Sequence, residues 1–255
     1  MRTIAILNLK GGTGKTVSTA TMARAIAAFH KKRVICIDMD AQGHLSQYFD
    51  VIPEEGCTTY SLLTGEHEAF YPDWVTNTHE EGIDIIPSDI NLARLDIMGS
   101  CVHLAAVDDL RMAMEEDDAY DFMLLDCHPG FGKATQAALY AADEVLIPIR
   151  LDTFSTSGMA ELVTQVNDMR KLNPRLRVAG VLATQYMGTE EEQEAHRALK
   201  MLCPFPVFHT RIRMSKPVLR SVNRHESLFV TSPTCGAARD YRAFVAEYME
   251  GGAIA

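Results

Sequence analysis

A glycine-rich segment, Lys10-Gly11-Gly12-Thr13-Gly14-Lys15-Thr16, follows directly on an apolar run that ends at Leu7. Successive glycines let backbone N–H groups turn toward one point, and a helix that begins after them adds the positive end of its dipole. The spacing departs from the common pattern G-x-x-x-x-G-K-[ST], because Leu9 stands where the first glycine is expected. The segment still predicts a strand, a phosphate loop and a helix, in that order.

Two side chains after the glycines carry the expected chemistry. Lys15 would reach the β- and γ-phosphate oxygens, and the Thr16 hydroxyl would ligate Mg²⁺. A second lysine, Lys10, opens the loop, where it is poorly placed for its own phosphates and well placed to reach a nucleotide held by a second copy of the chain. The expected nucleotide-binding residues are Lys10, Gly11, Gly12, Thr13, Gly14, Lys15, Thr16 and Val17.

Apolar runs and helical patterns alternate along the rest of the chain. Buried strands are expected at residues 2–7, 33–38, 83–87, 120–126, 144–149 and 178–183. Helices are expected at residues 16–30, 58–65, 91–98, 103–114, 156–172, 190–202 and 237–249. This order predicts an α/β fold with a doubly wound, mostly parallel twisted sheet flanked by helices. We expect a single domain over residues 1–255, with 252–255 as a flexible tail.

The segment KGGTGKT resembles the deviant Walker A motif of the ParA/MinD family, whose signature lysine acts across an ATP-sandwich dimer. Asp38-Met39-Asp40-Ala41-Gln42-Gly43 resembles the family's D-x-D-P-Q-G segment, with Ala41 where proline is usual. The resemblance implies that Asp38 belongs to the Mg²⁺ shell and that Asp40 positions or polarises the attacking water. The implied catalytic residues are Lys10, Lys15 and Asp40. Alternatively, the two aspartates have only a structural role, as an acidic turn that caps the next helix.

The run Tyr120–Asp126 matches a Walker B strand, in which Asp126 supports Mg²⁺ through water. The expected metal residues are therefore Thr16, Asp38 and Asp126. Where the family usually continues Thr-Pro-Pro, this chain has Cys127-His128-Pro129. His128 could contact a phosphate or a partner, or be a tolerated loop residue.

Residues 184–188 and 208–213 are expected to flank the adenine, since family members close the base between two loops there. Residues 211–225 hold five basic residues and no acidic ones, in a chain with 24 Lys and Arg against 34 Asp and Glu. On a helix, residues four apart share a face, and such a face can neutralise DNA phosphates without reading bases. A solvated basic helix face is the alternative. The candidate DNA-binding residues are Arg211, Arg213, Lys216, Arg220 and Arg224.

Composition limits the remaining possibilities. The net charge of −10 argues against a protein that is basic all over, though not against a local basic patch. The six cysteines show no CxxC spacing, which favours a reduced cytoplasmic compartment. No apolar run is long enough to span a membrane, and the acidic C-terminal segment argues against membrane recruitment.

The resemblance implies a ParA-type (Soj-like) partition ATPase, with ATP and Mg²⁺ as cofactors and weak hydrolysis unless a partner stimulates it. The implied partners are a second copy of the chain, non-specific DNA and an activator of the ParB class, with the protein on the bacterial nucleoid. A MinD-like ATPase that positions another cellular machine is the main alternative. A metabolic relative, such as an iron–sulfur dimer or an amide-forming ligase, and a DNA-binding regulator without turnover are further ones.

Overall fold

The computed structural model describes residues 1–65, 71–97, 102–151 and 155–251. Its strands form one eight-stranded sheet in the order β3-β4-β2-β5-β1-β6-β7-β8. All neighbouring strands are parallel except β3 and β4, which are antiparallel. The strands are β1 (Arg2–Ile6), β2 (Val34–Met39), β3 (Thr76–Asn77), β4 (Ile83–Ile86), β5 (Phe122–Cys127), β6 (Glu144–Arg150), β7 (Arg177–Tyr186) and β8 (Val207–Arg213).

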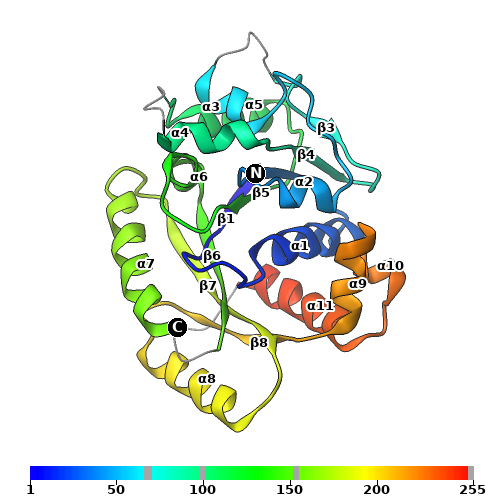
Figure 1. Cartoon of the computed structure of the whole chain (residues 1–255), viewed down its shortest axis with the longest axis vertical. Coiled ribbons are helices and arrows are strands. Elements are labelled where there is room, and N and C mark those ends of the chain that lie inside the picture. Colours follow the sequence, from blue (N-terminus) through cyan, green and yellow to red (C-terminus); the bar gives the residue numbers. More distant parts are fainter. Residues whose placement is uncertain (66–70, 98–101, 152–154, 252–255) are drawn as a thin grey trace.

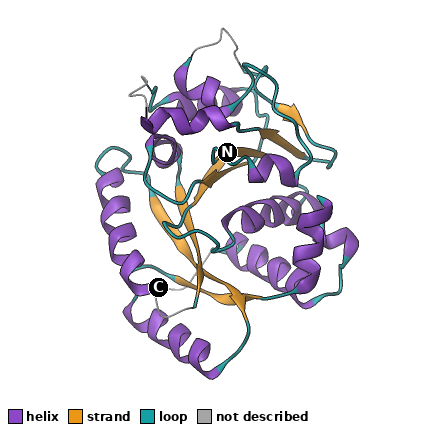
Figure 2. Cartoon of the chain, in the orientation of Figure 1, coloured by secondary structure: helices purple, strands orange, loops and turns teal. Residues whose placement is uncertain are grey.

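Helices cover both faces of this sheet (Figures 1 and 2). One face carries α1 (Lys15–His30), α2 (His44–Tyr48), α9 (Lys216–Arg224), α10 (Leu228–Thr231) and α11 (Gly236–Met249). The other carries α3 (Thr59–Thr64), α4 (Arg94–Ile97), α5 (Ala106–Glu116), α6 (Lys133–Ala141), α7 (Ser155–Arg170) and α8 (Glu190–Leu202). The doubly wound, mostly parallel α/β fold predicted from the sequence is confirmed.

Small residues on α1 explain why it packs so closely between the sheet and α11. Ala20, Ala23 and Ala25 are fully buried there, against Ile4 and Ile6 of the central strand β1. The apolar side of α11 is also buried, with Phe244 fully inside the core. Because β1 lies in the middle of the sheet, the loop that follows it emerges at the centre of the carboxyl edge.

Most expected elements are present, with their ends within three residues of the expected positions. The expected helix at 91–98 is instead a 3-10 turn, η1 (Ile90–Ala93), followed by α4, and residue 98 lies outside the described chain. Residues 208–213 were expected to be a loop beside the adenine. The prediction of a loop is wrong, because these residues form most of strand β8. The tail expected at 252–255 lies outside the described residues.

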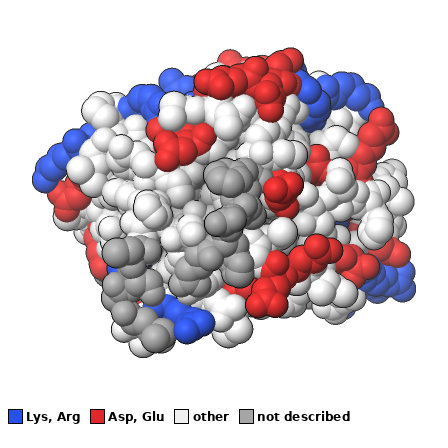
Figure 3. All heavy atoms as spheres, turned by 90° about the horizontal axis from the view of Figure 1, so that it is seen from above, with Lys and Arg blue, Asp and Glu red and all other residues white. Residues whose placement is uncertain are grey.

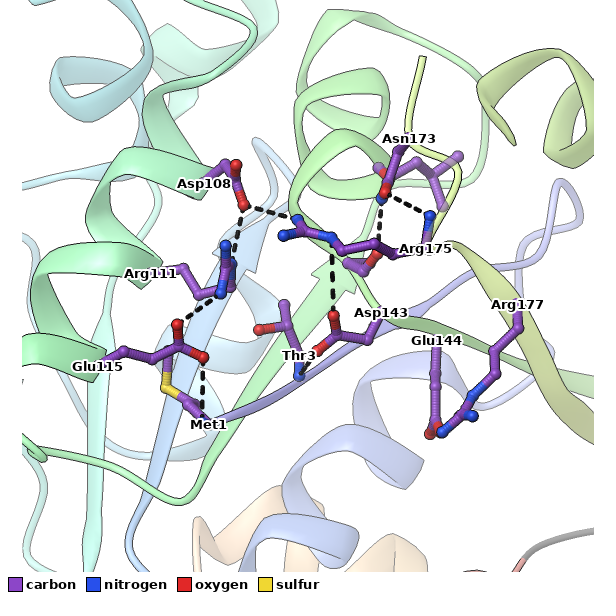
Figure 4. A network of polar contacts seen from close by, with 12 residues as sticks. Met1, Thr3, Asp108, Arg111, Glu115, Asp143, Glu144, Asn173, Arg175 and Arg177 are labelled. Atoms are coloured by element: carbon purple, nitrogen blue, oxygen red, sulfur yellow. Dashed lines mark hydrogen bonds and ion pairs between the residues drawn. The ribbon is translucent and has the colours of Figure 1, made fainter. Parts of the chain in front are cut away.

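The opposite, amino edge of the sheet is tied together by ion pairs (Figure 4). Arg111 of α5 is largely buried and pairs with Asp108 and Glu115. Arg175 reaches Asp108 and, more distantly, Asp143, which also accepts a hydrogen bond from the backbone of β1. This network joins α5 to the starts of β1 and β6, away from the glycine-rich loop.

Candidate functional site

The glycine-rich loop connects β1 to α1 at the carboxyl edge of the sheet. Gly12 and Gly14 have φ angles of 72° and 81°, which side-chain-bearing residues rarely adopt. Among the described residues, no acceptor is found for the backbone N–H groups of residues 11–17, and no side chain caps α1. The Thr13 hydroxyl is also buried without a hydrogen-bond partner. Unpaired donors gathered at a helix start suit an anion such as a phosphate chain.

Lys15 lies within this cradle. Its side chain is largely buried, and its Nζ donates to the Lys10 carbonyl oxygen at 3.0 Å. Burial lowers the pKa of Lys15, while the Asp126 carboxylate opposes that shift. The amine is thus held at the loop and close to a buried negative charge, as expected for a phosphate ligand.

Lys10 lies at the start of the loop, where its backbone N–H donates to Asn8 Oδ1 at 3.0 Å. Its Cε is 4.0 Å from the position that a Cβ on Gly158 would take, so the side chain lies against the first turns of α7 in its own chain. A role for Lys10 across a dimer interface stays a prediction.

Strand β7 braces the loop from the side. Thr184 Oγ1 donates to the Thr13 carbonyl at 2.7 Å and lies 2.9 Å from the Ile149 carbonyl. Gln185 Nε2 donates to the Gly12 carbonyl at 2.7 Å. These contacts hold the carbonyl groups of Gly12 and Thr13 toward β7, so they leave the loop N–H groups available for a ligand. Residues 184–188 were expected to flank the adenine, and this bracing role was not predicted, because no local sequence signal marks it.

Two buried carboxylates stand at the ends of adjacent strands, since Asp38 of β2 and Asp126 of β5 are opposite one another in the register. Ser46 binds Asp38 Oδ2 through its backbone N–H at 2.9 Å and its hydroxyl at 2.8 Å. Thr19 Oγ1 lies 3.1 Å from Asp126 Oδ1. Burial raises the pKa of Asp38 to about 6. Burial and then the charge of Asp38 raise the pKa of Asp126 to about 7, and hydrogen bonds from Thr16 and Thr19 oppose this.

Carboxylates that repel each other in a buried place favour a cation between or beside them. No group of three or more His, Cys, Asp or Glu ligands occurs in the described chain. A hard cation held here by Thr16, Asp38 and Asp126 would therefore take further oxygen ligands from water and phosphate, which is the usual habit of Mg²⁺. The donor set fits that ion.

Asp40 lies just past β2, and its carboxylate is mostly shielded from solvent. Its Oδ1 accepts hydrogen bonds from the Gln42 backbone N–H at 3.0 Å and from His128 Nδ1 at 3.0 Å. The ring of His128 is 52% exposed. From the sequence, His128 could contact a phosphate or a partner, or be a tolerated loop residue; in the structure its ring contacts Asp40.

A hollow of about 830 Å³ opens beside the ends of β7 and β8. Its lining includes Tyr186, Met187, Thr210 and Arg211. The Arg211 guanidinium lies 4.6 Å from the centroid of the Tyr186 ring, and its Nη1 is 3.2 Å from the Tyr186 hydroxyl. Tyr186 follows the loop-bracing Thr184 by two residues on the same strand, β7. Both segments expected to flank the adenine contribute to it.

The structure separates the five candidate DNA-binding residues into two groups. Arg213 forms a two-pronged ion pair with Asp240 at 2.7 and 2.8 Å, and Arg211 is held on Tyr186. Lys216, Arg220 and Arg224 are exposed along α9 and form no ion pair with any described residue. Figure 3 shows that the face seen from above carries several groups of acidic side chains, with Lys and Arg side chains toward its rim. The exposed, unpaired part of the candidate DNA-binding set is therefore the three residues of α9 among those described, and their contact with DNA stays a prediction.

No helix in the described part of the chain is long and apolar enough to cross a membrane. The apolar side chains of α11 face the core, and Tyr241 and Phe244 are buried.

The strand, glycine-rich loop and helix, with carboxylates ending two neighbouring parallel strands, define a P-loop nucleotide-binding protein of the doubly wound class. A family model described as "AAA domain" matches residues 1–178. The chain is 31% identical over 253 residues to the chromosome-partitioning ATPase Soj of Thermus thermophilus, covering 98% of this chain and 96% of Soj. It is 34% identical over 190 residues to the chromosome partitioning protein ParA of Caulobacter vibrioides, covering 73% of this chain and 70% of ParA. The chain belongs to the ParA/Soj family of P-loop ATPases.

Solved structures support the same fold. Apo McdA from Cyanothece superposes with a TM-score of 0.84 at 21% identity, over 98% of this chain and 99% of McdA. The cell division ATPase MinD of Pyrococcus furiosus gives a TM-score of 0.77 at 19% identity, over 98% of both chains.

Proposed function

We propose that this chain is an ATP-dependent partition ATPase that moves chromosomal or plasmid DNA. ATP joins two copies face to face, the dimer binds DNA without sequence preference, and hydrolysis releases it. The observation that carries this proposal is the phosphate loop with its unpaired N–H groups beside two buried carboxylates. Its relatives Soj and ParA bear the names of chromosome-partitioning proteins.

ATP would place its phosphates on the N–H groups of residues 11–17 and on Lys15, with the base in the hollow beside Tyr186. The aromatic ring and the guanidinium stacked on it are both planar groups on which a purine could stack. Thr16, Asp38 and Asp126 would hold Mg²⁺, which supplies charge neutralisation at the phosphate oxygens when bound.

Hydrolysis needs little covalent chemistry from the protein, because phosphoryl transfer depends mainly on positioning and charge stabilisation. Lys15 stabilises the charge that develops on the γ-phosphoryl oxygens, and Asp40 orients the attacking water. Lys10 leaves its place against α7 and supplies a second positive charge to the nucleotide of the partner subunit. An isolated subunit lacks that charge, so turnover is slow until the dimer forms.

DNA would lie along α9, where Lys216, Arg220 and Arg224 face solvent. A partner of the ParB class would stimulate hydrolysis and so release the DNA. Because the dimer would bind DNA without sequence preference, we expect the protein in the cytoplasm, on the nucleoid. The buried apolar side of α11 is not available to lie on a membrane, which disfavours the MinD-like alternative.

The test is the mass of the protein in solution, measured by light scattering with Mg²⁺-ATP and with Mg²⁺-ADP, together with retention on non-specific DNA and phosphate release. We expect the 28.3 kDa subunit to double in mass with ATP only, and to be retained on DNA only in that state. Lys15→Ala is the control that loses ATP binding. Equal mass and equal DNA affinity in both nucleotides would refute the proposal.

A further inference from the structure

His128 and Asp40 meet because of the register between two strands. Met39 at the end of β2 lies opposite Cys127 at the end of β5. The chain continues from these two residues into Asp40 and His128, and their side chains approach to 3.0 Å between His128 Nδ1 and Asp40 Oδ1. The contact therefore depends on what stands immediately after the Walker B strand.

The hydrogen bonds divide the two oxygens of the Asp40 carboxylate. Oδ1 receives both donors, the Gln42 backbone N–H and His128 Nδ1. Oδ2 receives none from the described residues. Two donors on one oxygen fix the plane of a carboxylate, and the other oxygen is then presented in one direction. A water molecule is the natural occupant of that second position.

We propose that His128 is a positioning residue for ATP hydrolysis, which holds Asp40 so that Oδ2 faces the attacking water. The inference rests on the proposed function, because it requires Asp40 to act on that water. In the reaction, a bond forms between the water oxygen and the γ-phosphorus while the bond to the β,γ-bridging oxygen breaks. The bridging oxygen keeps the electron pair and leaves with ADP, and a water proton passes through Asp40 Oδ2 to the released phosphate.

This role requires a hydrogen on His128 Nδ1, which donates to Asp40 Oδ1. The same ring placed on a phosphate would instead contribute to ATP binding. The two roles differ in what they change: a positioning residue changes kcat, whereas a phosphate ligand changes the affinity for ATP as well.

The experiment compares His128→Leu with His128→Asn, because the Asn side-chain NH₂ can occupy the place of Nδ1 and donate to Asp40, whereas Leu cannot. We expect His128→Leu to lower kcat by about 5- to 20-fold. The dissociation constant for a fluorescent ATP analogue should stay within about twofold of the wild type, and His128→Asn should recover at least about half of kcat. Thermal melts of both variants, alone and with nucleotide, verify that they are folded.

A matched control is His225→Leu, which removes another exposed histidine that faces an aspartate, at 3.5 Å from Asp50, away from the phosphate loop. It should leave kcat unchanged. The inference is overturned if His128→Leu keeps full kcat, if ATP affinity falls in parallel with kcat, or if His128→Asn is as slow as His128→Leu. A wild-type protein that hydrolyses no ATP refutes the proposed function itself, which distinguishes the two failures.

Discussion

Neutralising Arg220 and Arg224 together should remove most of the salt dependence of DNA binding. Three cations of α9 are exposed in each subunit, so a dimer that lays both copies of α9 on DNA neutralises about six phosphates. Each contact contributes about −0.9 to the slope of log K against log salt, which gives about −5 for the wild type and about −2 for Arg220→Gln/Arg224→Gln. Between 50 and 200 mM salt, affinity should fall about 1,000-fold for the wild type and about tenfold for the variant.

The measurement is fluorescence anisotropy on labelled duplexes of unrelated sequence, with Mg²⁺ and a non-hydrolysable ATP analogue. The loss of affinity should be the same for every duplex, since phosphates carry no sequence information. Arg213→Gln is the informative comparison, because that arginine is already paired with Asp240 and should leave the slope unchanged. An unchanged slope in the double variant, or an equal decrease in Arg213→Gln, would show that α9 is not the DNA-binding surface.

The remaining predictions concern rate and stability. Lys10→Ala should lower turnover by about 10³-fold or more while ATP is still bound, by analogy with a trans-acting arginine; turnover within about threefold of the wild type would contradict the role of Lys10. Asp126→Asn should raise the melting temperature of the nucleotide-free protein in chelator at pH 8. Because the pKa of Asp126 is raised to about 7, the folded state holds a proton that the unfolded state releases near pH 4. The free energy of unfolding of the wild type therefore falls as pH rises from about 4 to about 7, and the Asn variant does not undergo this loss. His196 is buried, its Nε2 lacks a partner and its pKa is lowered to about 4, so the stability it contributes is lost as pH falls from about 6.5 toward 4. Urea unfolding at pH 7.5 and pH 5 should show about 1–2 kcal/mol less acid destabilisation in His196→Leu, and equal losses in both proteins would exclude this role.

Periodicity and motif chemistry predict the parts of this molecule that are set by neighbours in the chain. Helix α8 was predicted at its exact bounds, and in the structure Thr189 and Glu192 form a capping box at its start. Strand β8 was missed, because it holds several polar and basic residues and was interpreted as a binding segment. Its buried residues Val207, Phe208 and Ile212 are interrupted by His209, Thr210 and Arg211, so its sequence lacks the continuous apolar run of the central strands.

Within the site, too, features set by neighbouring residues could be predicted, whereas features set by distant residues could not. Residues 10–17 are contiguous, and their geometry follows from the glycines and the start of α1. The bracing of the loop by Thr184 and Gln185 involves residues more than 170 positions away, with side chains that are ordinary for a strand end. The separation of Arg211 and Arg213 from the exposed cations likewise depends on Tyr186 and Asp240, which only the fold brings near. Counting charges in a window could not reveal that two of the five were already engaged.

The register of β2 and β5 determines both which carboxylates come together and which residue meets Asp40. Any chain in which both strands end on aspartate brings the two carboxylates together, because parallel neighbours end at the same edge. The pairing of Asp38 with Asp126 can therefore be expected from the sequence once the two strands are recognised as neighbours. The residue that meets Asp40 is decided one step further on, by the first positions of the loop after β5, and here that residue is a histidine. His128 contacts Asp40 and not the buried pair Asp38 and Asp126, so on our proposal a change at this position should alter the rate of hydrolysis and not the binding of ATP.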